Sequence, residues 1–222
     1  MAERTEDDIL FEEIDDELRQ DRVHKMWKAY GHYVIGLALA IVVGVGGYKA
    51  WRYYDLTSRQ AAGERFATAA QLAADNKTED AYKAFSGIAT DGTRGYKVLA
   101  RFSQARLMAQ KGDAKGAAGV YQALSEDSTL DSLYQDMAVI LGAIVELHIP
   151  GTDWAGLDER LTPLSSGTSP WRFSAREISA IAAEQTGDKN KARDLYKSLN
   201  DDAMAPQGVR ARAQEMLSIL GK

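Results

Sequence analysis

The chain has 222 residues, no cysteine, 45% apolar residues and a formal net charge of −5 at pH 7. This composition excludes a disordered chain, and the lack of cysteine excludes disulfides, thiolate nucleophiles and metal sites held by cysteine. The acidic balance argues against nucleic acid as a partner, and the length accommodates one domain of moderate size with an extension.

The first 28 residues form an acidic tail. They contain ten acidic and five basic side chains, so the tail has the same net charge as the whole chain, and residues 49–222 are neutral in sum. Within the tail, Ile9, Ile14 and Leu18 have a spacing that fits one face of a short helix. Two interpretations remain open: an amphipathic helix that docks to a partner, and a solvated tail without fixed structure.

Residues 29–48 form a segment of 20 residues without Asp, Glu, Lys or Arg. As a helix it would rise about 30 Å, which matches the hydrocarbon thickness of a bilayer. Its eight Val, Ile and Leu side chains contribute roughly −2.4 to −4.8 kcal/mol to membrane insertion. Aromatic residues flank both ends, as they do at membrane interfaces: Trp27, Tyr30, Tyr33, Tyr48, Trp51, Tyr53 and Tyr54. The segment is predicted to be a single transmembrane helix.

Two alternatives to a membrane anchor are a buried core helix of a globular protein and a cleaved signal peptide. A signal peptide begins with a short positive region and ends at a cleavage site of small residues. Here an acidic tail of 28 residues comes first, and the segment continues into aromatic and charged residues. The favoured prediction is an uncleaved signal anchor over residues 29–48.

Basic residues on the two flanks of this segment predict its orientation. The ten residues before it contain four Lys or Arg, and the ten after it contain two. Because the more basic flank stays in the cytoplasm, residues 1–28 are predicted to form a cytoplasmic tail and residues 49–222 a periplasmic domain.

Three small residues of the segment, Gly36, Ala40 and Gly44, lie four positions apart on one helical face. This is the spacing that lets two membrane helices approach closely. The pattern indicates a packing face, with self-association of the chain as one outcome.

The predicted periplasmic part contains an internal repeat. Each copy has an alanine, a second alanine 12 residues later, an aromatic residue four positions after that and an aliphatic residue three positions further. The three copies occupy residues 69–88, 105–124 and 180–199, with Asn76, Gly112 and Gly187 between their alanines. This spacing predicts pairs of antiparallel helices that cross most closely at the alanines, joined by left-handed turns.

A fourth, degenerate unit is predicted in the gap between the second and third copies, which is about two periods long. Its predicted alanines are Ala143 and Ala155, again 12 residues apart. The turn is placed at residues 148–151, with a short second helix starting near Trp154 and Leu157. The chain is thus predicted to be all-α: one transmembrane helix, then an array of about four helical hairpins with a continuous core.

This layout resembles tetratricopeptide repeats. The second unit departs from that family's pattern, because Arg101 and Gln104 stand where the family often has Trp and Leu. The resemblance implies a concave groove that binds extended peptides or partner proteins, with first-helix residues such as Arg106 and Glu177 facing it.

The whole chain resembles the YfgM-like family of bacterial envelope proteins. The residues that carry this resemblance are an acidic N-terminus followed by HKMWKAYGHYVIG, the exit sequence GYKAWRYY, and the C-terminal stretch SPWRFSAREISAIAAEQTGDKNKARDLYKSL. The resemblance implies an ancillary subunit of the Sec translocon in the bacterial inner membrane, with a membrane-anchored, prolyl-isomerase-like periplasmic chaperone as a partner. The alternative is a scaffold for another envelope assembly, such as cell division or respiratory-complex biogenesis.

No constellation of side chains in the sequence indicates catalysis. The three histidines lack metal-ligand spacing, adjacent acidic residues diverge on a helix, and the nucleophile motif G-x-S-x-G does not occur. The chain is therefore predicted not to be an enzyme and to have no catalytic residue, cofactor or metal site. Its expected partners are proteins and membrane lipid, without nucleic acid.

Overall fold

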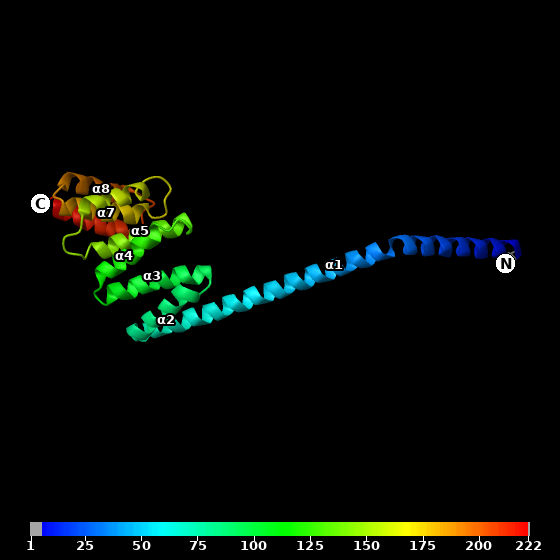
Figure 1. The fold of residues 1–222 in the computed structure, drawn as a ribbon. Helices are drawn as coiled ribbons and strands as arrows, with labels where there is room; N and C mark the ends of the chain where they lie inside the picture. The colour runs from blue at the N-terminus through cyan, green and yellow to red at the C-terminus, as the bar shows by residue number, and fades with distance from the viewer. Residues whose placement is uncertain (1–5, 222) are drawn as a thin grey trace. The chain divides into compact units, whose positions relative to one another are not determined.

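The computed structural model describes the backbone of residues 6–221 and the side chains of residues 24–221. Every regular element in this part of the chain is a helix, so the predicted all-α class is confirmed. The chain divides into two compact units between Gln60 and Ala61 (Figure 1). The apolar face predicted for the acidic tail falls on side chains that lie outside the described residues.

Helix α1 (Glu6–Ala74) is 69 residues long and contains the predicted membrane segment. Its part from His24 to Ala74 includes an 18-residue window with a mean hydropathy of 1.7, of which 6% is buried. A core helix of a globular protein would bury such a window, so this exposure argues against the core-helix alternative. By length and composition, α1 is a candidate membrane span, although a signal sequence would meet the same criteria.

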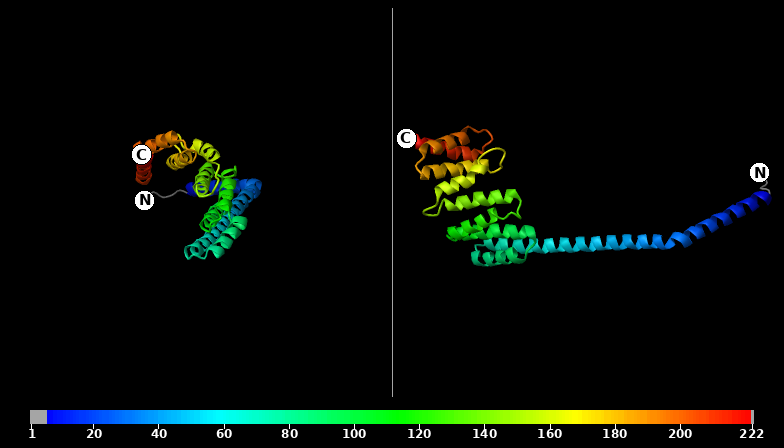
Figure 2. Two further views of the ribbon diagram at one scale, coloured as in Figure 1. Left: turned by 90° about the vertical axis from the view of Figure 1, so that its left-hand side faces the viewer. Right: turned by 45° about the horizontal axis from the view of Figure 1, so that its top comes forward.

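The second unit, residues 61–222, is an array of antiparallel helices. Consecutive helices pack against each other in chain order, as Figures 1 and 2 show. After the end of α1, the elements are α2 (Thr78–Asp91), α3 (Arg94–Gln110), α4 (Ala114–Ser125), α5 (Ser132–Glu146), α6 (Trp154–Leu161), the 3-10 helix η1 (Thr162–Leu164), α7 (Arg172–Gln185), α8 (Lys189–Asp201) and α9 (Gln207–Leu220). The predicted hairpins correspond to the end of α1 with α2, α3 with α4, α5 with α6, and α7 with α8.

The repeated alanines lie where the paired helices meet. All six alanines of the three regular units are fully buried: Ala69, Ala81, Ala105, Ala117, Ala180 and Ala192. The aromatic and aliphatic positions of the repeat are also buried: Phe85, Tyr121, Tyr196, Ile88, Leu124 and Leu199. The predicted close crossings and the predicted buried face of each second helix are therefore confirmed.

The turns between paired helices adopt the left-handed backbone conformation that the sequence predicts. Asn76 has a φ of 59°, Gly112 of 87° and Gly187 of 81°. After two of these turns an aspartate caps the next helix: Asp113 accepts a hydrogen bond from the backbone N–H of Gly116, and Asp188 does the same for Lys191. Each turn thus ends one helix and starts the next within a few residues.

Two glycines of the second hairpin are expected to respond oppositely to replacement by alanine. Gly112→Ala is expected to lower the free energy of unfolding by about 1–2 kcal/mol, because a Cβ atom is strained at its positive φ. Gly119→Ala is expected to raise it by about 0.5–1 kcal/mol, because Gly119 lies inside α4 with open space around its Cβ position. Chemical unfolding followed by circular dichroism measures both effects, and changes of the same sign would contradict the assignment of these backbone conformations.

The third hairpin differs from the prediction in its second helix. Ala143 is buried as expected, but Ala155 is exposed, so its predicted role is wrong. The capping residue Asp153 lies four residues before Leu157, as Asp113 lies before Ala117. Leu157, which is buried, therefore occupies the position of the repeated alanine. Because the turn of the third hairpin is longer, the spacing from Ala143 to Leu157 is two residues longer than the spacing between the two repeated alanines of the other hairpins.

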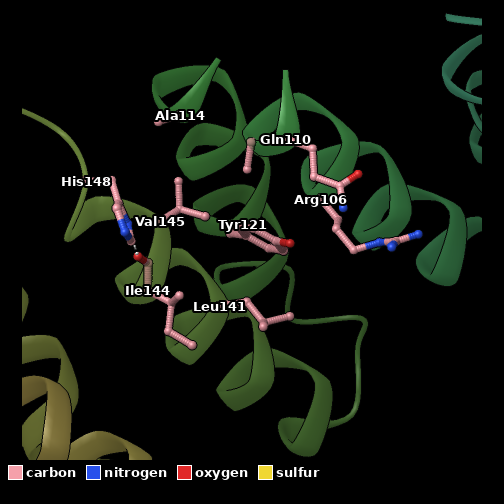
Figure 3. Close-up of a pocket in the computed structure, with 9 residues that line it drawn as sticks. Arg106, Gln110, Ala114, Tyr121, Leu141, Ile144, Val145 and His148 are labelled. Carbon is pink, nitrogen blue, oxygen red and sulfur yellow. Dashed lines mark hydrogen bonds between the residues drawn. The ribbon is translucent and has the colours of Figure 1, made fainter. Parts of the chain in front are cut away.

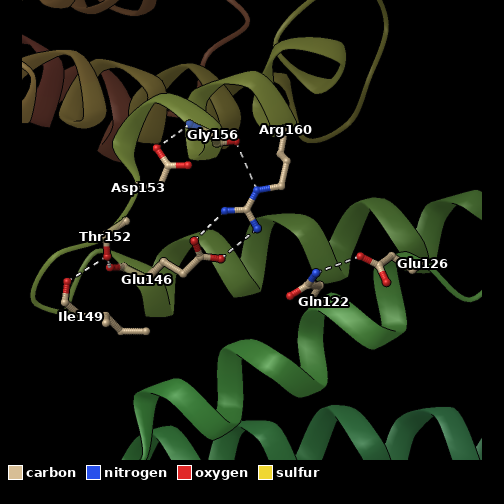
Figure 4. Close-up of polar contacts among 8 residues, drawn as sticks. All are labelled: Gln122, Glu126, Glu146, Ile149, Thr152, Asp153, Gly156 and Arg160. Carbon is tan, nitrogen blue, oxygen red and sulfur yellow. Dashed lines mark hydrogen bonds and ion pairs between the residues drawn. The ribbon is translucent and has the colours of Figure 1, made fainter.

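The residues that follow Leu157 in α6 and η1 keep the corrected register. Leu161 and Leu164 are buried at the positions of the repeated aromatic and aliphatic residues. In the longer turn, the Thr152 hydroxyl donates to the backbone carbonyls of Glu146 and Ile149, at 2.7 and 2.8 Å (Figure 4). Gly151 has a φ of 78°, so the left-handed turn predicted at residues 148–151 is present.

The buried side chains form four clusters along the array. Each cluster joins one hairpin to the first helix of the next, so the hairpins share a continuous core, as predicted for a repeat array. The last cluster is completed by α9, whose Val209 and Ala213 are buried against the fourth hairpin. Helix α9, which was not predicted from the sequence, has the position of a terminal capping helix.

Candidate functional site

A pocket of about 430 Å³ lies between α3 and α5, the first helices of the second and third hairpins. Leu141, Ile144 and Val145 of α5 form its apolar wall, and Tyr121 of α4 also lines it (Figure 3). Ile144 is 41% exposed, although it is a large apolar residue. An apolar pocket with a few polar groups around it is the usual form of a binding site.

Besides Tyr121, three polar residues border this pocket: Arg106, Gln110 and His148. Arg106 of α3 and His148 after α5 lie on opposite sides of Tyr121 in Figure 3. The Nδ1 atom of His148 donates a hydrogen bond to the backbone carbonyl oxygen of Ile144, at 3.1 Å. Burial raises the pKa of the Tyr121 hydroxyl, and the positive charge of Arg106 opposes that rise. Arg106, which sequence analysis placed in the groove, therefore lines an actual pocket beside Tyr121.

Glu177, the second residue predicted in the groove, lies on α7 and does not line this pocket. Its two carboxylate oxygens accept hydrogen bonds from Arg212 of α9, at 2.5 and 2.8 Å. These hydrogen bonds raise the pKa of Arg212. Glu177 thus links the last hairpin to the capping helix, and the structure does not bring it together with Arg106.

The small-residue face of α1 is open in the described structure. Apart from the adjacent residues and the backbone of α1 itself, no heavy atom of the described residues lies within 4 Å of a Cβ placed on Gly36 or Gly44, and Ala40 is exposed. The packing of this face against a second membrane helix stays a prediction.

An arginine–aspartate ion pair that was not predicted from the sequence recurs in three hairpins. Each arginine lies four residues before the repeated alanine and pairs with an aspartate 26 residues later, at or just after the end of the second helix. The pairs are Arg65–Asp91 at 3.0 Å, Arg101–Asp127 at 3.2 Å and Arg176–Asp202 at 3.7 Å. The sequence contains a signal of this pair, because the number of residues from the arginine to the aspartate is the same in all three copies.

This ion pair explains the departure of the second unit from the tetratricopeptide pattern. Arg101 is half-buried and pairs with Asp127, just after the end of its own hairpin. Gln104 donates a 3.0 Å hydrogen bond to the Ser86 hydroxyl of the preceding hairpin. Polar contacts thus replace the apolar ones at these two positions.

The third hairpin has a different ion pair. Val139 stands where the other hairpins have arginine, and it packs against the apolar core. Instead, Arg160 of α6 donates two hydrogen bonds to the Glu146 carboxylate of α5, at 3.1 and 2.6 Å (Figure 4). The two helices of this hairpin are therefore joined directly by a bidentate pair.

Tyr196, the repeated aromatic residue of the fourth hairpin, donates a 2.6 Å hydrogen bond to the Glu184 carboxylate of α7. Burial, and then this hydrogen bond, raise the pKa of the Tyr196 hydroxyl above its ordinary value of 10.0. Because the unfolded chain loses this proton at a lower pH than the folded chain, the stabilisation is present below pH 10 and is lost as the pH rises further.

Tyr196→Phe is expected to lower the free energy of unfolding at pH 7 by about 1–2 kcal/mol, because the hydrogen bond to Glu184 is lost. It is also expected to make the decline of stability above pH 10 less steep. Denaturant unfolding between pH 7 and pH 11 measures both effects. Tyr121→Phe, which removes a hydroxyl without such a bond, is the matched control at pH 7, where it is expected to have the smaller effect. A wild-type pH dependence in Tyr196→Phe would contradict the prediction.

Among residues 24–221, no group of three His, Asp or Glu side chains is placed to hold a metal ion. The pocket between α3 and α5 has no acidic residue in its lining and contains one arginine, one glutamine, one tyrosine and one histidine. Its composition suits contact with a protein segment.

Comparison with known families gave one match. A family model described as a tetratricopeptide repeat-like domain matches residues 24–217, which include the apolar segment of α1 and nearly all of the helical array. No curated protein matches the chain.

Proposed function

We propose that this chain, which belongs to the tetratricopeptide repeat-like family, is a membrane-anchored interaction module and an ancillary subunit of the Sec translocon. In this role it links the translocon to periplasmic chaperones. Domains of this family are protein–protein interaction modules and are generally non-catalytic.

The open pocket between α3 and α5 is the observation that carries the proposed interaction role. Ile144 is exposed, and Leu141 and Val145, which pack partly on the core, line the same apolar wall beside it. First helices of consecutive hairpins line such surfaces in repeat arrays, where they bind partner segments. A partner residue seated here would remove this apolar surface from water.

Membrane anchoring is supported by the exposed apolar side chains of α1. The eight Val, Ile and Leu residues of residues 29–48 are each more than half exposed. A continuous apolar surface of this length is unfavourable in water, and it is stable when the hydrocarbon core of a bilayer surrounds it. The flanking Trp27 and Trp51 are also exposed, as expected for side chains at the two membrane interfaces. We propose the bacterial inner membrane, with residues 1–28 in the cytoplasm and residues 49–222 in the periplasm.

The translocon and chaperone partners are proposed from the resemblance to the YfgM-like family. Co-purification of the full chain in mild detergent, through a tag after Lys222, tests this assignment. We expect translocon channel subunits and a membrane-anchored chaperone in the eluate. Recovery of a different envelope complex without translocon subunits would contradict the assignment and favour the scaffold alternative.

A pair of variants tests whether the pocket takes part in this interaction. Ile144→Asp places a charge on the apolar wall and is expected to reduce recovery of the chaperone at least fivefold. Ala123→Asp introduces the same charge at an exposed position of α4 that does not line the pocket, and is expected to leave recovery unchanged. Equal recovery with both variants would contradict a role for the pocket.

A further inference from the structure

Two hairpins carry a tyrosine at the same repeat position, but only one has an internal partner for its hydroxyl. In the fourth hairpin, Tyr196 donates to Glu184, which lies four residues after the repeated alanine Ala180. In the second hairpin, the corresponding residue is Ala109, which lines the pocket beside Tyr121. The carboxylate that satisfies the tyrosine in one hairpin is therefore missing in the other.

The Tyr121 hydroxyl forms no hydrogen bond with any residue of the described part of the chain, although Tyr121 is only 4% exposed. The hydroxyl oxygen itself is accessible from the pocket, where a bound group can reach it and form a hydrogen bond. Arg106, which borders the same pocket, forms neither a hydrogen bond nor an ion pair with the described residues, and its charge acts on Tyr121. The Tyr121 hydroxyl, which is a hydrogen-bond donor, and the Arg106 guanidinium, which is a cation, thus both border a pocket without an acidic residue in its lining.

We infer that this pocket binds an acidic side chain of a partner protein, flanked in the partner's sequence by aliphatic residues. The partner carboxylate accepts the Tyr121 hydroxyl proton in a hydrogen bond and pairs with the Arg106 guanidinium. The aliphatic neighbours pack on Leu141, Ile144 and Val145. The inference rests on the proposed interaction role and specifies the chemistry of the segment that is bound.

The choice of an acidic side chain follows from the fourth hairpin. There the Tyr196 hydroxyl donates a hydrogen bond to a glutamate side chain, that of Glu184, at 2.6 Å. The pocket volume of about 430 Å³ accommodates such a side chain together with an aliphatic neighbour. Contacts between the aliphatic neighbours and the apolar wall bury apolar surface and so contribute affinity. Tyr121 and Arg106 together make the pocket specific for a negatively charged side chain.

The test uses fluorescent peptides and the full chain in mild detergent. The probe is the capped peptide acetyl-Gly-Ser-Gly-Ile-Glu-Leu-Gly-Ser-Gly-amide, with a matched peptide in which Gln replaces Glu. Fluorescence polarisation is expected to show about tenfold tighter binding of the Glu peptide. Tyr121→Phe and Arg106→Gln are each expected to reduce this preference to about threefold or less. Tyr196→Phe, whose hydroxyl already has an internal partner, is expected to keep it.

Three results would overturn the inference. The first is equal or undetectable binding of the Glu and Gln peptides, and the second is an unchanged preference in both Tyr121→Phe and Arg106→Gln. The third is tighter binding of a peptide without Glu that ends in a free carboxylate, since this would assign the pocket to chain termini. Co-purification of translocon subunits is a separate measurement on the same variants. If it persists while the peptide preference fails, only the chemistry of the bound segment is wrong.

Discussion

Leu157→Ala is expected to lower the free energy of unfolding by about 2–5 kcal/mol, whereas Ala155→Leu is expected to change it by about 0.5 kcal/mol or less. Leu157 is buried between α5, α6 and α7, so its truncation leaves a cavity in the core. Ala155 is exposed on α6, where a larger side chain meets solvent. Denaturant unfolding followed by the fluorescence of Trp154 and Trp171, which pack on the same core, measures both changes.

This pair of variants separates two alignments of the third hairpin. If Ala155 were the crossing residue, a leucine there would force the helices apart and would destabilise the array by about 1–3 kcal/mol or more. The loss from Leu157→Ala would then be small. That reversed order of effects would contradict the register described here. Leu161→Ala, at the next buried position of α6, is expected to behave like Leu157→Ala.

The regular hairpins could be predicted because several local signals coincide in them. In the second and fourth hairpins, two alanines, a turn glycine, a capping aspartate and a buried aromatic residue recur at fixed offsets. The third hairpin keeps the cap but replaces the alanine with Leu157. Alanines are frequent in this chain, so the 12-residue spacing to Ala155 arose by coincidence. The capping Asp153 was the more reliable marker, because a cap fixes where a helix begins.

The candidate site was only partly predictable because it depends on contacts between distant segments. Periodicity identifies the outward face of a first helix, and Arg106 does border a pocket. Glu177 has the same kind of position, but its partner Arg212 lies 35 residues later on α9, a helix that the repeat does not include. The unpaired state of the Tyr121 hydroxyl is also invisible in the sequence, since it depends on what α3 and α5 place around it.

The second large effect is expected in the membrane segment. The double substitution Leu39→Arg and Val42→Arg is expected to abolish membrane integration of the chain. Two central arginines cost about 5–7 kcal/mol, whereas all eight aliphatic residues together contribute only roughly −2.4 to −4.8 kcal/mol. The sum therefore changes sign. A reporter that is active only after export, fused after Lys222, is expected to lose at least 90% of its signal, and the chain should leave the membrane fraction.

Two arginines at exposed positions of the helical array provide the control. Thr68→Arg and Ala123→Arg add the same charge outside residues 29–48, at positions exposed to solvent. This variant is expected to keep both the reporter signal and the membrane association. If the Leu39/Val42 variant kept them too, the segment would not be held by hydrocarbon, and the exposed apolar surface of α1 would need a protein partner to cover it. If the unsubstituted chain gave no reporter signal, the helical array would lie on the other side of the membrane. The acidic-segment partner of the Tyr121 pocket would then have to be sought in the cytoplasm.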